Sequence, residues 1–364
     1  MNVLISGASI GGPVLAYWLR EHGFDVTVVE RAPAPRRGGQ AIDIRGAALE
    51  VAERMGILEQ ARAKKTDMRG MSMVDGDGNE LMRTTEETVS GGRLDSPDIE
   101  IMRDDLTALV IAASGSGVEY LYGDSIAALH DDGQGVQVTF ESGVRRHFDY
   151  VVGADGLHSN VRGLVFGEES RFIHHLGMYV AIYSAENFLG LDRWQVWHRE
   201  GDAGFGLYTA PGNASIRVNI GFGGEDVAYD YRDVEQQKRL IEERCSGLGW
   251  ETPRLLKAMW AADDFYFDAM AQIRMERWSE GRVTLVGDAG YCASPLSGQG
   301  TSLAMVGAYV LAQELSRDPQ GAFDRYEARM RPFAELNQAL ALENPGQGAA
   351  PESVQRAANG IVLD

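Results

Sequence analysis

The segment VLISGASIGGPVLAYWLREHGFDVTVVE, residues 3–30, has the strongest structural signal in the chain. Its parts predict, in order, a strand, a glycine turn, a helix and a second strand: Val3–Ile5, Gly7–Gly12, Val14–Leu19 and Val26–Val29. Short apolar or β-branched runs on either side of a helical segment are typical of a strand–helix–strand unit. Such a unit implies a parallel sheet, because both strands run in the same direction.

The turn has the pattern Gly7-x-Ser9-x-x-Gly12, with serine in place of the usual second glycine. Gly7 permits a tight turn, Gly12 lets helix and strand pack closely, and the free amides of the helix N-terminus can bind a pyrophosphate. Glu30 ends the second strand, where a carboxylate would hold the ribose hydroxyls of FAD or NAD. An ordinary glycine turn has the same pattern, so this motif alone leaves both interpretations open.

Two more turns follow predicted buried strands. Gly153-Ala154-Asp155-Gly156 comes after Tyr150-Val151-Val152, and Gly287-Asp288-Ala289-Gly290-Tyr291 comes after Val283–Val286. The second of these continues through Pro295, Gly298 and Gly300 into a predicted helix at Thr301–Leu315. If the ligand is a flavin, Asp288 would accept a hydrogen bond from a hydroxyl of its ribityl chain. The positive end of the helix dipole would stabilise the anion that forms when the flavin is reduced.

The middle of the chain differs from the beginning. Residues 70–100 predict short strands with a hairpin turn at Asp75–Asn79, and residues 172–267 predict mostly antiparallel strands followed by helices at Val234–Cys245 and Thr252–Trp260. The sequence therefore predicts a mixed α/β fold with a discontinuous dinucleotide-binding domain, residues 1–69, 101–170 and 276–340. A substrate domain, residues 70–100 and 171–275, interrupts it. Residues 341–364 are predicted to form a weakly specified C-terminal tail.

Composition limits the classes of partner. The chain has 34 basic and 53 acidic side chains and a net charge of −19, which disfavours binding to nucleic acid or to anionic membranes. We find no run that is long and apolar enough for a membrane helix and no basic leader segment before Val3. Two isolated cysteines, Cys245 and Cys292, and no histidine cluster favour a reducing cytoplasm and no metal site.

In this order, the Gly7 turn, Asp155-Gly156 and Gly287-Asp288 resemble the class A FAD-dependent monooxygenases, aromatic hydroxylases with the p-hydroxybenzoate hydroxylase fold. The resemblance covers roughly residues 1–335, and residues 287–315 are its most specific part. In size the chain is similar to the tetracycline-inactivating flavin monooxygenases and to antibiotic-pathway hydroxylases. The resemblance implies a Rossmann-like FAD-binding domain with a parallel sheet, interrupted by a substrate domain with a mostly antiparallel sheet.

The implied activity is hydroxylation of a small aromatic or polyketide-type molecule, in antibiotic biosynthesis or inactivation. NADPH or NADH would reduce the FAD, and O₂ would add to it as a C4a-hydroperoxide that transfers one oxygen atom. No side chain need act as a nucleophile, so no catalytic residue is assigned beyond the flavin-site loop Pro295, Gly298 and Gly300. The implied partners are a small-molecule substrate and O₂, for a monomer or homodimer.

The resemblance also implies roles for individual residues. The residues expected to bind FAD are Gly7, Ser9, Gly12, Glu30, Arg31, Asp43, Arg103, Asp155, Asp288, Pro295, Gly298 and Gly300. The candidates for binding NAD(P)H are Arg36, Arg37 and Asp155, where a solvated basic loop is the alternative for the two arginines. The candidates for binding substrate are Gln195, Trp197, Tyr208, Arg217 and Asn219, where packing in an aromatic core is the alternative.

Three residues depart from the family pattern, which usually has histidine at Tyr291, asparagine at Ser302 and an acidic residue at Gly307. A non-catalytic flavin- or drug-binding protein whose active site has decayed is therefore one alternative. A flavin-dependent reductase of the same fold is another. A halogenase is a third, but Trp194-x-x-Trp197 lacks the WxWxIP spacing of those enzymes and the chain has few lysines.

Overall fold

The computed structural model describes residues 1–35, 38–224, 227–343 and 348–364. Its first large sheet has six strands in the order β19-β20-β13-β1-β2-β9. These are β19 (Ser279–Glu280), β20 (Val283–Leu285), β13 (Tyr150–Gly153), β1 (Asn2–Ser6), β2 (Asp25–Glu30) and β9 (Val118–Tyr122). All neighbours pair in parallel except β19, which is antiparallel to β20. The predicted parallel sheet is confirmed.

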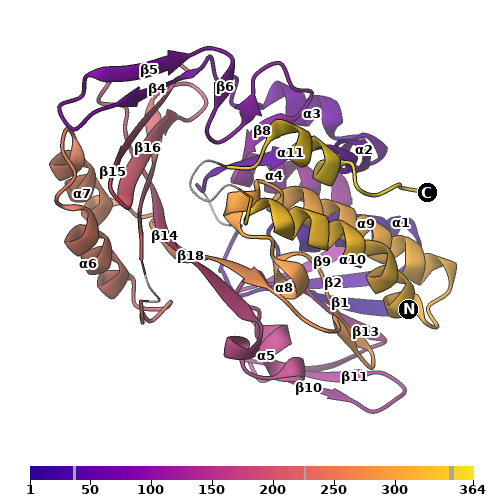
Figure 1. Ribbon diagram of the computed structural model, residues 1–364. Helices are drawn as coiled ribbons and strands as arrows, with labels where there is room; N and C mark the ends of the chain where they lie inside the picture. The colour runs from indigo at the N-terminus through magenta and orange to yellow at the C-terminus, as the bar shows by residue number, and fades with distance from the viewer. Residues whose placement is uncertain (36–37, 225–226, 344–347) are drawn as a thin grey trace.

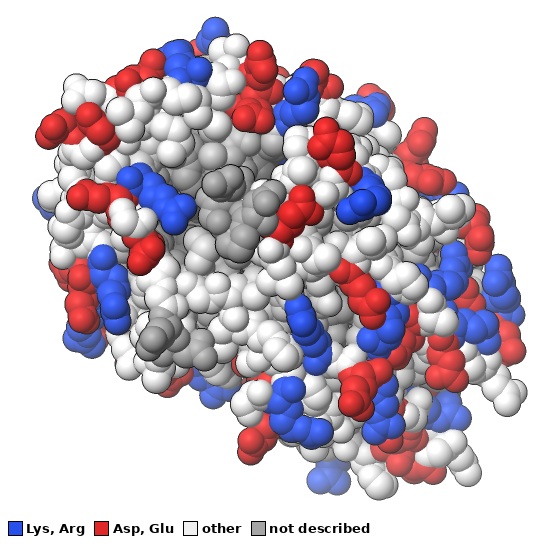
Figure 2. All heavy atoms as spheres, in the orientation of Figure 1, with Lys and Arg blue, Asp and Glu red and all other residues white. Residues whose placement is uncertain are grey.

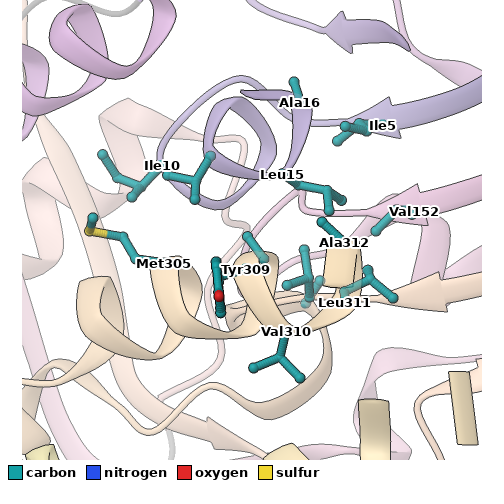
Figure 3. Close-up of a cluster of buried hydrophobic side chains, with 14 of the residues drawn as sticks. Ile5, Ile10, Leu15, Ala16, Val152, Met305, Tyr309, Val310, Leu311 and Ala312 are labelled. Atoms are coloured by element: carbon teal, nitrogen blue, oxygen red, sulfur yellow. The ribbon is translucent and has the colours of Figure 1, made fainter. Parts of the chain in front are cut away.

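Helices cover this sheet and close its core (Figure 1). They are α1 (Gly11–Glu21), α2 (Ala47–Arg54), α3 (Leu58–Ala63), α4 (Arg103–Ser114), α5 (Asn160–Phe166), α8 (Asp288–Tyr291), α9 (Gly300–Arg317) and α10 (Ala322–Leu340). Figure 3 shows the centre of this core, where Ile5 of β1, Val152 of β13, Leu15 of α1 and Leu311 of α9 meet. Burying such apolar side chains contributes about 1.5–3 kcal/mol each, so this core fixes where the turns at the strand ends lie.

The second large sheet has seven strands in the order β18-β14-β17-β16-β15-β4-β5. These are β18 (Tyr266–Ile273), β14 (Ile173–Glu186), β17 (Ser215–Gly223), β16 (Ala203–Thr209), β15 (Gln195–Glu200), β4 (Met71–Val74) and β5 (Glu80–Thr84). Only β15 and β4 pair in parallel, so the mostly antiparallel sheet is confirmed. Its strands come from residues 71–84 and 173–273, within the segments assigned to the substrate domain; the domain boundaries themselves stay a prediction.

A separate hydrophobic core lies on one face of the second sheet. Along β17, Ile216, Val218, Ile220 and Phe222 are buried and alternate with partly exposed residues. The buried set packs against α6 (Val234–Cys245) and α7 (Thr252–Ala261), which cover the outer face of the sheet in Figure 1. Because side chains alternate between the faces of a strand, Arg217 and Asn219 must point to the other face, toward the rest of the molecule.

The fold also contains three small sheets. The first pairs β3 (Ala41–Ile44) with β8 (Ile99–Met102), and the second pairs β6 (Glu87–Thr88) with β7 (Gly92–Arg93). The third consists of β10 (Ile126–Asp131), β11 (Val136–Phe140) and β12 (Arg145–Phe148). Among the described residues, no helix is long and apolar enough to cross a membrane.

The prediction of a weakly specified tail is wrong for its last residues. Pro351–Ala358 form α11, which packs on α10, and Leu363 is buried in the first core. The Tyr309 hydroxyl donates to the Asp364 carbonyl oxygen at 2.7 Å. The tail looked polar and short in the sequence, and its anchoring depends on tertiary contacts with α9 that no local pattern reveals.

Candidate functional site

The turn between β1 and α1 requires glycine at both ends of its motif. Gly7 has φ of +107°, and a Cβ there would lie 2.4 Å from the Ala154 carbonyl oxygen. A Cβ on Gly12 would lie 1.9 Å from the Gly7 carbonyl oxygen. Both distances are far below van der Waals contact, so the backbone leaves no room for a side chain. The glycines thus bring the first turn of α1 onto the end of β1, as the motif predicts.

Glu30 lies beside this turn and holds it to the end of β2. Its Oε2 accepts a hydrogen bond from the Ala8 amide at 2.9 Å, and its Oε1 accepts one from the Ala32 amide at 2.9 Å. A small cavity opens here, lined by Ala8, Ser9, Glu30, Pro35, Arg103 and Thr107. It combines a carboxylate, a guanidinium and a helix N-terminus, which are the groups that bind the ribose and diphosphate of a dinucleotide. Arg31 is exposed next to it.

The second motif builds the neighbouring turn. Asp155 Oδ2 accepts hydrogen bonds from the Ser6 hydroxyl at 3.2 Å and the Val161 amide at 3.1 Å, and the Ser159 hydroxyl donates to its Oδ1. Burial raises the pKa of Asp155. Its carboxylate therefore joins the ends of β1 and β13 to α5, while direct contact of Asp155 with FAD or NAD(P)H stays a prediction.

The third motif begins α8 with Asp288 and continues to the N-terminus of α9. A Cβ on Gly300 would lie 3.8 Å from Asp288 Oδ1, so the carboxylate faces the start of α9. Burial raises the pKa of Asp288. Between them, Pro295 is exposed and Gly298 adopts a left-handed conformation with φ of +62°. Gln299 is fully buried, and both polar atoms of its amide lack a hydrogen-bond partner among the described residues.

The three turns lie next to one another. Gly7 meets Ala154 of the second motif, as described above, and the buried Arg162 just after that motif donates from Nη1 to the Ala289 carbonyl oxygen of the third at 3.0 Å. A Cβ on Gly287 would lie 3.2 Å from Cβ of Ala304 in α9, and one on Gly11 would lie 3.5 Å from it. The N-termini of α1 and α9 therefore approach the same region, and the three motifs converge there.

Asp43 lies on β3 at the edge of this region, together with a residue that the sequence analysis missed. Arg45 is buried two residues later, and its Nη2 lies 3.0 Å from Asp43 Oδ2. The Arg45 amide donates to the Ser302 hydroxyl at 3.0 Å, which ties the end of β3 to the first turn of α9. Burial outweighs the attraction of Arg45 and raises the pKa of Asp43 to about 7. The alternation Asp43-x-Arg45, which puts both on one face of a strand, was the available signal.

The unusual residues of the third motif fit one another. The Tyr291 hydroxyl hydrogen-bonds to the Tyr326 hydroxyl at 2.9 Å, and a Cβ on Gly307 would lie only 2.0 Å from the Tyr291 hydroxyl oxygen. Glycine at 307 therefore makes room for tyrosine at 291. Ser302, as noted, accepts from the Arg45 amide. The three residues that depart from the family pattern are therefore packed or hydrogen-bonded within the fold. This gives no support to the alternative of a decayed active site.

The substrate candidates share one face of the second sheet. The register pairs Gln195 with Tyr208 and Tyr208 with Arg217, and it places Trp197 opposite Gly206 and Gly206 opposite Asn219. Residues that are directly opposite in a sheet point to the same face. The five candidates thus form two adjacent rows on the face away from α6 and α7. Gln195 and Trp197 lie two positions apart on β15 and so share this face, as the alternation of side chains along a strand requires.

This inner face touches the loop that precedes β3. Arg217 Nε donates to the Gly39 carbonyl oxygen at 2.9 Å, and the Ala41 amide donates to the Tyr208 hydroxyl at 3.0 Å. On the other side of the loop, Arg103 Nη2 donates to the Gly38 carbonyl oxygen at 3.1 Å. The loop therefore connects the dinucleotide side to the substrate side. Arg36 and Arg37, the NAD(P)H candidates, lie outside the described residues.

The site as a whole fits FAD. The glycines let the first turn of α1 lie against the end of β1, and the cavity beside Glu30 offers groups for a ribose and a diphosphate. The buried Gln299 amide has polar atoms without a partner in the described part of the chain. A parallel sheet with its turns gathered at the carboxyl ends of the strands is the place where α/β proteins bind nucleotides. The fold and the turns thus define a dinucleotide-binding protein with an attached antiparallel sheet.

Comparison with known proteins identifies the family. A model of the FAD binding domain family matches residues 1–340. The chain is 52% identical over 367 residues to an uncharacterized protein of Mycobacterium tuberculosis, covering 100% of the chain and 99% of the relative. It is 36% identical over 341 residues to a flavin-dependent monooxygenase of Legionella longbeachae, covering 93% of the chain and 87% of the relative.

Among solved structures, the chain is similar to tetracycline destructase Tet(51), with a TM-score of 0.90 and 34% identity, over 100% of this chain and 99% of that one. The chain therefore belongs to the FAD binding domain family, and within it to the class A FAD-dependent monooxygenases, which are oxidoreductases. The family predicted from the three motifs is confirmed.

Proposed function

We propose that the protein uses NADPH or NADH and O₂ to hydroxylate a small aromatic or polyketide-type molecule bound on the inner face of the second sheet. The observation that supports this most is the pair of rows formed by Gln195, Tyr208 and Arg217 and by Trp197 and Asn219. An aromatic ring among a few polar groups is typical of a pocket that binds and orients a small molecule. The rows face the loop that joins them to the FAD side.

The residues proposed to hold FAD are those that the three turns bring together. The start of α1 would bind the diphosphate, Glu30 the adenosine ribose, and Asp288 the ribityl chain. When bound, FAD supplies the redox chemistry, by accepting a hydride from NAD(P)H and activating O₂. The chain's own part is to orient the substrate and to exclude water. The loop at Pro295, Gly298 and Gly300 would shape the place where the flavin ring and the substrate meet.

Individual polar groups on the inner face have distinct parts in this proposal. The Trp197 indole lies over Gly206, where a Cβ would be 2.3 Å from the ring, and its Nε1 donates to Gln195 Oε1 at 2.9 Å. The indole is therefore held flat against the sheet and would stack on an aromatic substrate. Asn219 Oδ1 is buried and has no hydrogen-bond partner in the described part of the chain, so it is available to a substrate hydroxyl or amide.

The test is a screen of aromatic and polyketide compounds, with the purified chain loaded with FAD. Tetracyclines belong in the screen, because the structure similar to this chain is called a tetracycline destructase. We expect a substrate to stimulate NADPH or NADH oxidation under air and to gain one oxygen atom, measured by mass spectrometry. Oxidation of the nicotinamide without oxygen gain would instead identify a reductase. The cytoplasmic location and the monomeric or homodimeric state stay predictions.

The FAD site is tested separately. Asp288→Ala removes the proposed ribityl contact, and we expect it to weaken FAD binding greatly, measured by flavin fluorescence titration. Asp263, which lies between α7 and β18, offers a control, because Asp263→Ala changes the net charge equally outside the three motifs. Equal flavin content in both variants would contradict the assignment of Asp288.

A further inference from the structure

The edge strand β18 runs directly along the third motif. The Ile273 amide donates to the Cys292 carbonyl oxygen at 3.1 Å, and Gln272 Nε2 donates to the Ala293 carbonyl oxygen at 3.2 Å. Because side chains alternate along a strand, Tyr266, Asp268 and Gln272 share the face that meets this loop. The other face of β18 packs Phe267 and Ala269 into the second core. Tyr266 and Asp268 therefore face the FAD side of the molecule.

Tyr266 lies at the meeting point of the two proposed pockets. It is opposite Ile182, which is opposite Asn219, so its ring continues the row of substrate candidates that ends at Trp197. Tyr266 is 44% exposed, so the protein's own side chains do not enclose its ring.

The Tyr266 hydroxyl is held by a buried carboxylate. It donates to Asp268 Oδ2 at 2.8 Å. Asp268 Oδ1 accepts from the Tyr229 hydroxyl at 3.0 Å and from the Ala269 amide at 2.8 Å, and it lies 3.2 Å from His158 Nε2. Asp268 is thus bonded on both oxygens, and the direction of the Tyr266 hydroxyl is fixed by groups from three separate segments.

His158 links this carboxylate to the second motif. It follows Asp155-Gly156-Leu157, and its Nδ1 lies 2.7 Å from Glu169 Oε1. Glu169 also pairs with the buried Arg162, at 2.6 Å from its Nη2, and the Tyr231 ring stacks on the imidazole with centroids 4.7 Å apart. A chain of hydrogen-bonded groups therefore runs from the FAD side through His158 and Asp268 to Tyr266.

The charged groups in this series of hydrogen bonds are paired at neutral pH. Burial by itself lowers the pKa of His158, but the hydrogen bonds to Asp268 and Glu169 outweigh it and raise the pKa to about 9. Burial by itself raises the pKa of Asp268, but the hydrogen bond from His158 outweighs it and holds that pKa below the usual value. Removing the imidazolium would leave the buried Asp268 carboxylate without its charged partner, which is strongly unfavourable.

We propose that Tyr266 borders the flavin ring, and that His158 and Asp268 are positioning residues that hold it there. The inference rests on the proposed FAD site and adds a contact that none of the three glycine motifs contains. A tyrosine ring in contact with a flavin quenches the flavin fluorescence by electron transfer, whereas a phenylalanine or leucine does so far less. The fluorescence of bound FAD therefore reports the position of Tyr266 without any substrate or turnover.

The experiment measures the fluorescence yield of FAD bound to the full chain, together with the FAD dissociation constant. We expect Tyr266→Leu and Tyr266→Phe to raise the yield at least about threefold while FAD still binds. His158→Gln should give part of this rise, and His158→Lys, which keeps the positive charge, less of it. Tyr229→Phe is the matched control, because it removes the other phenol bonded to Asp268 but packs with Phe267 in the second core.

The pH dependence gives an independent readout. The positive charge of His158 is present below its pKa and is lost as the pH rises through about 9. We expect the yield of the wild-type chain to rise in that range and the yield of His158→Gln to stay flat there. An unchanged yield in both Tyr266 variants with FAD bound would overturn the inference, as would identical pH profiles for wild type and His158→Gln. Failure of the wild-type chain to bind FAD would instead overturn the proposed function.

Discussion

The two large sheets build their parts of the site by different means. In the parallel sheet, the groups proposed to bind FAD lie on turns just after the strands, and the shape of the site depends mainly on backbone atoms and glycines. In the antiparallel sheet, the candidate substrate-binding groups are side chains that lie along the strands on one face. The first arrangement suits a cofactor that is the same in every family member, because backbone contacts change little with sequence. Under the proposed function, the second would let substrate preference change by substitution at Gln195 or Asn219 without changing the backbone.

The dependence of the parallel sheet on its backbone can be tested at two adjacent glycines. A Cβ on Gly12 would lie 1.9 Å from the Gly7 carbonyl oxygen, whereas a Cβ on Gly11 would make an ordinary contact of 3.5 Å with Ala304 Cβ. We expect Gly12→Ala to weaken FAD binding at least about 100-fold, roughly 2.7 kcal/mol, and Gly11→Ala to change it by less than about threefold. Fluorescence titration measures both. Similar losses in the two variants would refute a backbone-specific effect.

The second expected effect concerns Gly307 and Tyr291. Gly307→Ala would gain about 1 kcal/mol of helix propensity, but its methyl group would lie 2.0 Å from the Tyr291 hydroxyl oxygen. Overpacking typically costs about 1–3 kcal/mol, so we expect net destabilisation in urea unfolding.

Tyr291→Phe, which loses the hydrogen bond to Tyr326, should cost about 1 kcal/mol. Since the phenylalanine also removes the clashing oxygen, we expect the double variant to be more stable than the sum of the two single changes predicts. Strict additivity would show that the two residues are independent, and the departures from the family pattern would then need another explanation.

A third effect follows from Asp43. Its pKa is about 7 in the folded chain, above the usual value for aspartate, so the folded state binds more protons than the unfolded state between about pH 4 and 7. Stability due to this group is therefore lost as the pH rises through that window, by at most about 1.4 kcal/mol per pH unit. We expect Asp43→Asn to flatten the pH dependence of the melting temperature there. Parallel curves for the variant and the wild type would contradict this.

The sequence predicted the parallel sheet and its three turns well, because each motif is local. Gly7, Asp155 and Asp288 each follow a buried apolar run within a few residues. The contact between Tyr291 and Gly307 could not be predicted from the sequence, because each residue looked like a separate departure from the family pattern. The contact depends on how α8 packs against α9.

The inner face of the antiparallel sheet was predicted only in part. The spacing of Gln195 and Trp197 shows that they share a face, but placing Asn219 beside Gly206 needs the register between strands, which no local pattern provides. The link between His158 and Asp268 spans 110 residues and joins two segments that looked unrelated. Long-range pairs of this kind are set by the packing of the two sheets.

The smallest expected effect is that of Asn219→Ala, which separates substrate binding from stability on the inner face of the second sheet. Asn219 Oδ1 is buried without a partner in the described part of the chain, and a buried unsatisfied polar group costs about 1–3 kcal/mol. We therefore expect Asn219→Ala to leave FAD binding and stability unchanged or slightly improved. For the first substrate found in the screen, it should raise KM about tenfold, roughly 1.4 kcal/mol.

Asn337 is the matched control for Asn219, because its Oδ1 is also buried without a partner among the described residues, while its Nδ2 donates to the Phe333 carbonyl oxygen at 2.8 Å. It lies on α10, where α11 packs, away from both rows of substrate candidates. Asn337→Ala should lower the melting temperature and leave KM unchanged. If the Asn219 variant lost stability and kept its KM, the inner face would be a packing surface, and the contrast between the two sheets would no longer hold.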